Sequence, residues 1–312
     1  MNPLSMIFAG GVAFRNALYD RRVLKVRKLA RPVISIGNIS VGGSGKTPFV
    51  IALAELLKQL GIAVDVLSRG YGRVSSEIAV VDPNGSPRQF GDEPLLIARR
   101  LNVPVIVGAD RYQAGLLAEK TFSTRLHILD DGFQHRRLHR DFDIVLLPQT
   151  DATGTLLPVG RLREPISSLR RADAVVTFEA LALPHIAVPI WPAQRKITLP
   201  DLGGKAIAFC GIARPQQFFD GLLALHQAVA EKVAFPDHHR YRQQDIDRLL
   251  RLKRSTSADC FVTTEKDLIN LGALSTQLQP LKSAELQIEL SSPEQPISHL
   301  LETMEQRSGC RL

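Results

Sequence analysis

Cysteine is scarce in this sequence, and the few cysteines are not grouped. Cys210, Cys260 and Cys310 stand far apart, and no Cys-x-x-Cys pair is present. This pattern excludes a disulfide framework and a cysteine zinc site, and a reducing cytoplasm suits it best. Because Cys210 and Cys260 lie in apolar, strand-like runs, we expect both to be small core residues.

Aromatic residues that stack on bases are also few, with 4 Tyr and 1 Trp in 312 residues. Acidic residues are outnumbered by basic ones, 31 against 39, which gives a formal net charge of +8. This excess predicts an anionic partner, either nucleic acid, an anionic membrane surface or a phosphorylated small molecule. Because aromatics are scarce, we expect no nucleic-acid partner. A nucleic-acid-binding protein with a vestigial nucleotide loop is the non-enzyme alternative.

The N-terminal segment is apolar but too short to span a bilayer. Roughly ten apolar residues precede Arg15, and the segment lacks the positive region and cleavage site of a secretory signal. Its apolar residues recur at spacings of three and four, as on one helix face: Leu4, Ile7, Phe8, Gly11, Phe14 and Leu18. A basic cluster accompanies them: Arg15, Arg21, Arg22, Lys25, Arg27, Lys28 and Arg31. Residues 1–31 are therefore predicted to be a membrane-associating helix and basic segment at an anionic leaflet. The alternative is an amphipathic helix packed on its own domain.

From residue 32 onward, short apolar runs alternate with helical periodicity. Strands are predicted at 32–38, 62–68, 103–108, 125–131, 141–148 and 172–178. Because these runs are continuously apolar, they indicate a parallel sheet covered on both faces. The predicted fold is α/β, with a three-layer α/β/α domain at 32–180.

The composition changes between residues 181 and 204. Four prolines fall there with the lone Trp191: Pro184, Pro189, Pro192 and Pro200. Prolines suit extended connectors, so this stretch is predicted to be an interdomain linker. Strand and helix patterns resume beyond it, which predicts a second, smaller α/β domain at 205–312.

A glycine-rich turn, SVGGSGKT, joins the first predicted strand to the first predicted helix. It has the makeup of a phosphate-binding loop, in which backbone N–H groups and a helix N-terminus surround phosphate oxygens. Lys46 can reach the terminal phosphates, and the Thr47 hydroxyl can bind Mg²⁺. Ser40 replaces the motif's first glycine, so a structural turn is the alternative. The candidate nucleotide contacts are Ser40, Val41, Gly42, Gly43, Ser44, Gly45, Lys46 and Thr47.

Two aspartates, Asp130 and Asp131, end the strand predicted at 125–131. This edge of an open α/β sheet is where ligands bind, so one carboxylate can serve the metal and the other the nucleophile. The alternative is a turn, which Asp-Asp-Gly also favours.

The remaining motifs indicate the nucleotide. No N-K-x-D guanine signature occurs. The nearest candidate, TTEKD, has Lys266 and Asp267 adjacent, whereas the signature needs one residue between them. The missing guanine signature favours an ATP-using phosphotransferase. Arg69 and Arg73 of LSRGYGR and Arg163 of LREP are candidates to clamp phosphate oxygens. A soluble P-loop kinase or NTPase acting on a polar metabolite is the enzyme alternative.

The motifs together resemble a known family. GNISVGGSGKTP, LSRGYGR, GDEP, DDGFQH, LPVGRLREP, CGIARPQQF, FPDHHRY and TTEKD occur in the order found in the tetraacyldisaccharide 4′-kinases, the lipid A kinases of Gram-negative bacteria. The resemblance runs from about residue 4 to past residue 267 and includes the loop without its first glycine. It implies transfer of the γ-phosphate of ATP to the 4′-hydroxyl of a tetraacyldisaccharide 1-phosphate, forming the 4′-phosphorylated lipid A precursor. It also implies two α/β/α domains joined by a β-stranded linker.

The resemblance further implies a peripheral protein at the cytoplasmic face of the inner membrane, for which we expect a monomer. It implies roles for individual residues as well. His238 of FPDHHRY would be the base, held by Asp131, and His239 is its rival. Asp92 of GDEP would be a second essential carboxylate, serving either Mg²⁺ or the nucleophile. Asp130 would complete the Mg²⁺ shell with Thr47. Arg163 and Glu164 would position substrate or nucleotide.

Overall fold

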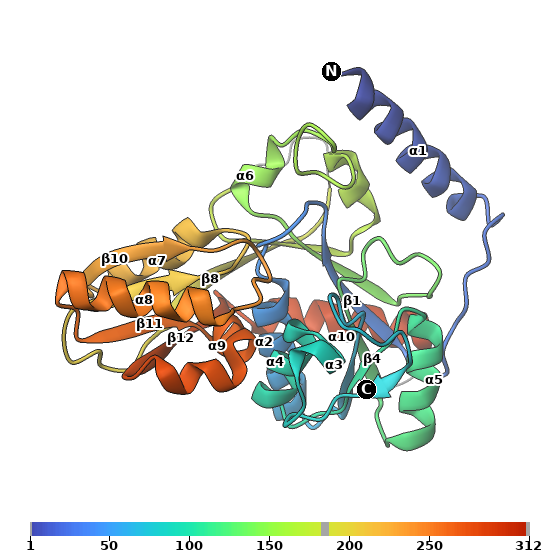
Figure 1. The fold of residues 1–312 in the computed structure, drawn as a ribbon. Coiled ribbons are helices and arrows are strands. Elements are labelled where there is room, and N and C mark those ends of the chain that lie inside the picture. Colours follow the sequence, from blue (N-terminus) through green and yellow to red (C-terminus); the bar gives the residue numbers. More distant parts are fainter. Residues whose placement is uncertain (1, 182–186, 310–312) are drawn as a thin grey trace.

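One mixed sheet runs through the molecule from end to end. The computed structural model describes residues 2–181 and 187–309, so Cys310 and part of the predicted linker, including Pro184, lie outside the described residues. Within the described residues twelve strands form this sheet, in the order β10-β9-β11-β12-β8-β7-β6-β1-β5-β2-β4-β3. Figure 1 shows the strands of the first half on one side and those of the second half on the other.

The first half of the sheet is parallel except at its edge. Its strands are β1 (Val33–Asn38), β2 (Val64–Ser68), β3 (Ala79–Val80), β4 (Val105–Val107), β5 (Leu126–Asp130), β6 (Phe142–Leu146) and β7 (Ala174–Thr177). Its helices are α2 (Lys46–Gln59), α3 (Pro87–Phe90), α4 (Asp92–Arg100), α5 (Arg111–Thr121) and α6 (Gln149–Ala152), with a 3₁₀ turn at Ile166–Arg171. The short β3 pairs antiparallel with β4. All six strands predicted from residue 32 to 178 are confirmed.

The second half of the sheet is also built from strands and covering helices, and it is smaller. Its strands are β8 (Ile190–Thr198), β9 (Ala206–Cys210), β10 (Val229–Ala234), β11 (Cys260–Thr264) and β12 (Leu281–Leu290). Its helices are α7 (Pro215–Ala224), α8 (Gln243–Thr256), α9 (Glu265–Leu271) and α10 (Glu294–Ser308), with a 3₁₀ turn at Gly272–Gln277. Cys210 and Cys260 are buried in this half, as expected.

Helices cover both faces of the sheet, which confirms the α/β fold. Alternate residues of β1 show this: Ile34 and Ile36 pack into the cluster that contains α2 and α4, whereas Val33 packs into the cluster beneath α5. The same division recurs on β9, where Ile207 packs under α8 and Ala208 under α7. Period-two side chains on a strand make such a two-sided core possible.

The predicted linker contains a long strand of the sheet. β8 pairs parallel with β7 and antiparallel with β12, so it joins the two halves by backbone hydrogen bonds. The described part of this stretch therefore contains a strand of the sheet, in line with the β-stranded linker that the family resemblance implies. Pro192 is tolerated in β8, and Trp191 packs at 5.8 Å from Phe142 in the main core. Because Trp191 is buried in the core of the first half, β8 packs as part of that half.

The C-terminal helix α10 returns to the first half. Its residues Ile297, Leu300 and Met304 belong to the cluster around α2, and Arg307 donates to Asp173 at 2.7 Å. The structure thus differs from the prediction that 205–312 forms one separate unit, because α10 packs away from the helices that precede it.

The N-terminal helix α1 (Pro3–Asp20) packs through polar contacts, beside the loop that follows α6 (Figure 1). Ser5 Oγ donates to Leu156 O at 3.0 Å, and Asn16 Nδ2 donates to Glu164 Oε2 at 2.9 Å. Phe8 is partly buried, but Leu4, Ile7 and Phe14 are exposed by 60%, 73% and 68%. Most of the predicted apolar face therefore points to solvent. Among the described residues, no helix has the length and apolarity that crossing a membrane requires.

We expect Gly37→Ala to destabilise the fold, because Gly37 lies where β1 meets the following loop. A Cβ there would lie 2.5 Å from Phe133 Cβ and 2.8 Å from Phe133 N, and Phe133 is fully buried. Such overpacking costs about 1–3 kcal/mol. The midpoint of urea unfolding should fall accordingly. Gly10→Ala is the control, because nothing lies within 4 Å of its added Cβ; equal midpoints for the two variants would contradict the assignment.

Candidate functional site

The glycine-rich loop lies between β1 and α2 and turns on three glycines. Gly42, Gly43 and Gly45 have φ of 66°, 61° and 92°, values that favour glycine. Side chains at Gly42 and Gly43 would also collide with the second half: an added Cβ would lie 2.7 Å from Ala213 Cβ and 2.7 Å from Arg214 Cγ. The loop therefore needs glycine both for its conformation and for the close approach of residues 213–214.

Ser40 has a different task from the glycines. Its side chain is buried and donates to Asp151 Oδ2 at 2.6 Å, while Asp151 Oδ1 accepts from Arg214 at 2.7 Å. Asn38 Nδ2 in turn donates to Ser44 Oγ at 3.0 Å. Ser40 thus anchors the loop through its side chain, whose hydroxyl proton is donated to Asp151. Its neighbour Val41 is held through backbone hydrogen bonding to Arg161.

Lys46 begins α2 and reaches the acidic edge of β5. Its Nζ lies 3.4 Å from Asp131 Oδ1, and Arg163 Nη1 lies 3.1 Å from Asp131 Oδ2. Burial opposes ionisation of Asp131, but the two cations lower the pKa of the carboxyl. Asp131 also has φ of 51°, a strained value for a non-glycine residue. Asp131, Lys46 and Arg163 therefore form one group of alternating charge next to the loop.

Asp130 is buried beside this group and lacks a full set of partners. Its Oδ2 accepts from Ser68 Oγ at 2.9 Å, whereas its Oδ1 is buried with no hydrogen-bond partner among the described residues. Burial, together with the charges of Glu93 and Asp131, raises the pKa of Asp130 to about 7. A buried carboxylate oxygen without a donor favours the presence of a cation. Thr47, in the first turn of α2, is also buried.

Asp92 and His238 meet across the boundary between the two halves. Asp92 begins α4, His238 follows β10, and His238 Nδ1 lies 2.8 Å from Asp92 Oδ2. The expected pairing of His238 with Asp131 is therefore wrong. Asp131 is held by the two cations described above, so Asp92 is the carboxylate that orients the imidazole. His238 has φ of 57°, so its backbone is strained like that of Asp131.

This contact determines how both groups are protonated. Burial alone would raise the pKa of Asp92, but the hydrogen bond to His238, with Lys266 and Asn270, lowers it to about 2. Burial alone would lower the pKa of His238, but the hydrogen bond to Asp92 raises it above its ordinary value. Asp92 is thus ionised at neutral pH and accepts from Nδ1. Nε2 is the nitrogen that remains to take a proton.

The rival histidine, His239, has a structural role. Its Nε2 lies 3.0 Å from Asp245 Oδ2, and its ring stacks on Phe235 with centroids 4.6 Å apart. Asp245 also accepts from the backbone N–H of Arg242 at the start of α8. His239 therefore fastens its loop to α8, while His238 turns to α4.

The other arginines and Glu164 do not form one set. Arg69 and Arg73 line a surface hollow of about 290 Å³ in the loop after β2, whereas Arg163 lies apart from it on Asp131. Glu164 is buried, and accepts from Asn16, Gln134 Nε2 at 3.1 Å and Arg171 Nη2 at 2.7 Å. The structure therefore places Glu164 as an anchor between α1 and the loop after β5, and not at an open surface where substrate would bind.

Several site residues carry no local sequence signal. Arg111 is buried at the start of α5, where burial and the charge of Arg69 lower its pKa to about 10 while Asp130 and Asp131 oppose that shift. Lys266 and Asn270 reach Asp92 from α9, in the other half of the chain. On its own, the spacing of TTEKD only excludes a guanine site. Considering TTEKD together with GDEP is the one signal that could have indicated the contact between Lys266 and Asp92.

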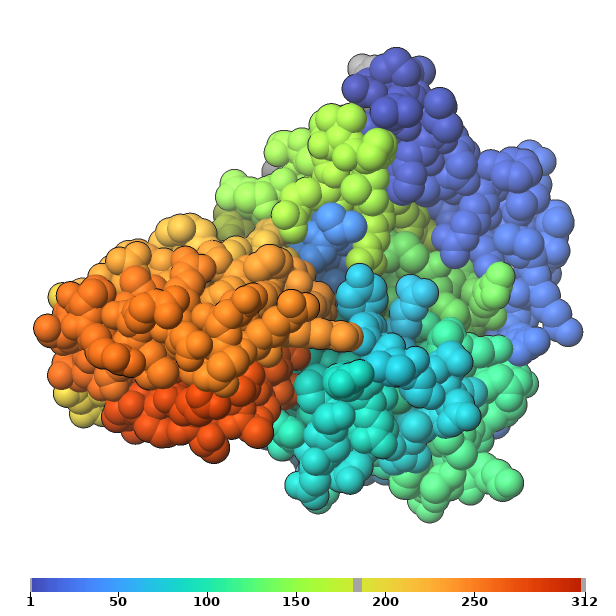
Figure 2. Space-filling view, in the orientation of Figure 1, coloured from blue at the N-terminus to red at the C-terminus, as the bar shows by residue number. Residues whose placement is uncertain are grey.

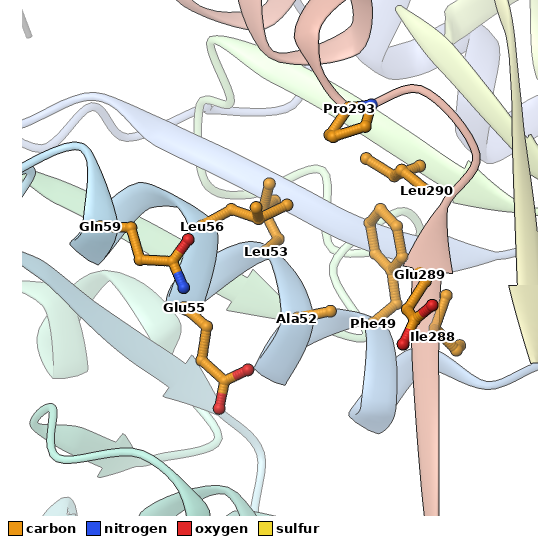
Figure 3. A pocket seen from close by; sticks show the side chains of 10 residues that line it. All are labelled: Phe49, Ala52, Leu53, Glu55, Leu56, Gln59, Ile288, Glu289, Leu290 and Pro293. Carbon is orange, nitrogen blue, oxygen red and sulfur yellow. The ribbon is translucent and has the colours of Figure 1, made fainter. Parts of the chain in front are cut away.

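A separate cavity of about 340 Å³ lies between α2 and β12 (Figure 3). Most of its lining is apolar, including Phe49, Leu53 and Ile288, and the acidic side chains of Glu55 and Glu289 also line it. None of the site residues described above lines it.

The site combines groups suited to phosphoryl transfer. A glycine loop at a helix N-terminus offers backbone donors to phosphate, and Lys46 supplies a positive charge beside it. A histidine held by an aspartate offers a base to an alcohol. The two features adjoin, because a Cβ on Gly42 would lie 3.7 Å from Oδ2 of Asp237, the residue before His238. Fold and site thus define a phosphotransferase of the P-loop kinase type.

Comparison with known proteins gives the family. The family model for tetraacyldisaccharide-1-P 4′-kinase matches residues 1–305. A tetraacyldisaccharide 4′-kinase from Koribacter versatilis is 49% identical over 99% of this chain and 100% of its own length. The enzyme of that name from Aquifex aeolicus is 40% identical over 86% of this chain and 88% of its own. A crystal structure of LpxK from Aquifex aeolicus in complex with ATP superposes with a TM-score of 0.79, at 36% identity, covering 97% of this chain and 98% of that one. The chain belongs to the tetraacyldisaccharide 4′-kinase family.

We expect His238→Ala to lower kcat at least a hundredfold and to leave ATP binding nearly unchanged, because general bases contribute about 10²–10⁴ in rate. His239→Ala, the matched control, should lose stability and retain most of its kcat. Steady-state kinetics and nucleotide-binding titration of both variants provide the measurement. Equal losses of kcat in the two folded variants would contradict the choice of histidine.

Proposed function

We propose that this chain transfers the γ-phosphate of ATP to the 4′-hydroxyl of a tetraacyldisaccharide 1-phosphate, with His238 as the base. The observation that carries the proposal is the His238–Asp92 hydrogen bond of 2.8 Å, formed next to a glycine loop with its lysine. In this reaction His238 Nε2 takes the proton of the attacking hydroxyl, and Asp92 stabilises the imidazolium that results. Both His238 and Asp92 are required in the same place, so the reaction needs the two halves of the chain together.

The glycine loop and its basic neighbours would hold the polyphosphate of ATP. Backbone N–H groups of residues 42–47 and the start of α2 supply donors and positive potential. Lys46 and Arg163 neutralise charge on transferring phosphoryl oxygens, and in this structure the carboxylate of Asp131 occupies them. Arg69 and Arg73 line a surface hollow and are further positive groups available to an anionic substrate such as a sugar 1-phosphate, and the buried Arg111 adds positive charge near Arg69.

The residues at the end of β5 also suit Mg²⁺. Asp130 supplies a buried oxygen without a donor, and the Thr47 hydroxyl is a hard oxygen ligand of the kind that Mg²⁺ accepts. When bound, Mg²⁺ would neutralise charge on the β- and γ-phosphates. A cation beside Asp130 would also keep its carboxyl ionised, against the burial that now raises its pKa.

The exposed face of α1 supports a peripheral position at the cytoplasmic face of the inner membrane. Leu4, Ile7 and Phe14 project from the helix, while Ser5 and Asn16 attach its other side to the domain. Basic residues follow directly, and an anionic leaflet attracts such a segment. The acyl chains of the proposed substrate would lie in the same leaflet, so α1 would bring the site to its substrate.

The reaction is tested by incubating the purified protein with labelled ATP, Mg²⁺ and the tetraacyldisaccharide 1-phosphate in detergent, followed by mass analysis. We expect a product heavier by one phosphate, with the new group at the 4′ position. Lys46→Ala should abolish the product while its thermal unfolding stays close to that of the parent, because it removes the charge that faces the phosphates. Phosphorylation of polar metabolites but not of the disaccharide would instead favour the soluble-kinase alternative.

The membrane role is tested with a triple variant, Leu4→Ser, Ile7→Ser and Phe14→Ser. Burial of each such side chain contributes about 1.5–3 kcal/mol, so sedimentation with phosphatidylglycerol vesicles should weaken at least tenfold. Turnover in detergent should change little. The matched control replaces Leu60, Leu223 and Leu225, which are also exposed but lie on other elements. The idea fails if both triple variants bind vesicles as the parent does.

A further inference from the structure

Lys266 lies at the junction of the two halves, next to the His238–Asp92 pair. It is the second residue of α9, and its side chain is only 15% exposed. Its Nζ lies 3.3 Å from Glu93 Oε1, 3.5 Å from Asp237 Oδ1 and 3.8 Å from Asp92 Oδ2. These carboxylates outweigh the effect of burial and raise the pKa of Lys266, so the side chain is an ammonium ion.

The ammonium group also faces the reactive nitrogen of the base. Lys266 Nζ lies 3.4 Å from His238 Nε2 and 3.8 Å from Asp92 Oδ2, the oxygen that His238 Nδ1 contacts. An ammonium group has donors and no acceptor. Its positive charge at this distance opposes a second proton on the ring, and the ionised Asp92 places the single ring proton on Nδ1.

We propose that Lys266 is a positioning residue that holds His238 in its neutral Nδ1–H form, with the Nε2 lone pair ready for the substrate hydroxyl. This inference rests on the proposed role of His238 as the base. During transfer, the hydroxyl proton moves to Nε2 as the sugar oxygen bonds to the γ-phosphorus and the bond to ADP breaks. The imidazolium then returns its proton to solvent, which repulsion by the nearby ammonium promotes.

The groups around the imidazole make Lys266 the decisive one. Asp92 and Glu93 face His238 from α4, Asp237 precedes it in its own loop, and the Tyr71 ring lies at 5.2 Å. The three carboxylates favour an imidazolium, which could not act as a base. Lys266 opposes protonation by its charge. Without it, the pKa of His238, which the hydrogen bond to Asp92 already raises, would rise further.

If Lys266 had only a structural role, that role would be to hold α9 against α4. Other contacts already hold these two helices together. Arg100 Nη1 donates to Glu265 Oε1 at 3.0 Å, and Asn270 Nδ2 donates to Asp92 Oδ2 at 3.1 Å. Both contacts join the same two helices and survive the loss of Lys266. A variant at this position therefore tests the charge more than the packing.

The first test measures the tautomer of His238 directly, in the unaltered full-length chain without nucleotide. Nitrogen-15 NMR of labelled histidine, assigned with the His238→Ala variant, should show a protonated Nδ1 and an unprotonated Nε2 at pH 8. In Lys266→Met, the resonances should move to the imidazolium position at a higher pH than in the parent. A proton on Nε2 in the parent, or titrations that coincide, would overturn the proposal even if the kinase activity is confirmed.

The second test uses the pH profile of kcat/KM. The base is active only when deprotonated, so the loss of activity on the acid side should begin at a higher pH in Lys266→Met. Near pH 6 we expect a deficit on the order of tenfold or more, most of which should return above pH 8. Lys266→Arg keeps the charge and should follow the parent profile. Lys196→Met, at an exposed ion pair on β8, is the control.

Other outcomes count against the inference. Equal losses at every pH in Lys266→Met and Lys266→Arg would show that only the shape of the lysine matters. Should Lys266→Met fail to fold, the tautomer of the parent and the profile of Lys266→Arg still decide the question. Loss of the whole reaction in the parent would contradict the proposed function and not this inference, which the NMR measurement examines separately.

Discussion

The hydrogen bond between His238 and Asp92 is the interaction on which the rest of the site depends. Each partner comes from a different half of the chain, so the histidine that we propose as the base is oriented only while the halves stay together. Figure 2 shows the later residues, in orange, pressed against the cyan segment of the first half. There Arg240 donates to Gly72 O at 2.8 Å, and Arg100 and Lys266 add ion pairs between α9 and α4.

The continuous sheet explains how this alignment is kept. β8 and β12 pair in the middle of the sheet, and α10 packs onto the core of the first half. These three elements therefore keep the two halves in a fixed position relative to each other. Two catalytic candidates, Asp131 and His238, have strained positive φ values. Such strain persists only where surrounding contacts fix the backbone. For Asp131 these contacts are its ion pairs with Lys46 and Arg163, and for His238 they are its contacts at the boundary between the two halves.

Charge is arranged so that each ionisable group has a different state. Asp92 is kept ionised by His238 and Lys266, whereas burial and the charges of Glu93 and Asp131 raise the pKa of Asp130 to about 7. Lys46 and Arg163 form ion pairs with Asp131, so that this carboxylate balances the positive charges that we propose for phosphate oxygens. Three aspartates thus differ in state because their surroundings differ: Asp92 orients His238, Asp131 pairs with two cations, and Asp130 is the residue that we propose as a metal ligand.

The sequence by itself determined the α/β fold, the strands around the loop and the family. Periodicity and a contiguous loop motif are local, so they can be read without the tertiary structure. Only the tertiary structure decided that Asp92, and not Asp131, holds His238, that Glu164 anchors α1, and that α10 returns to the first core. These contacts join residues more than a hundred positions apart. Their geometry is set by how the elements pack, which no local pattern records.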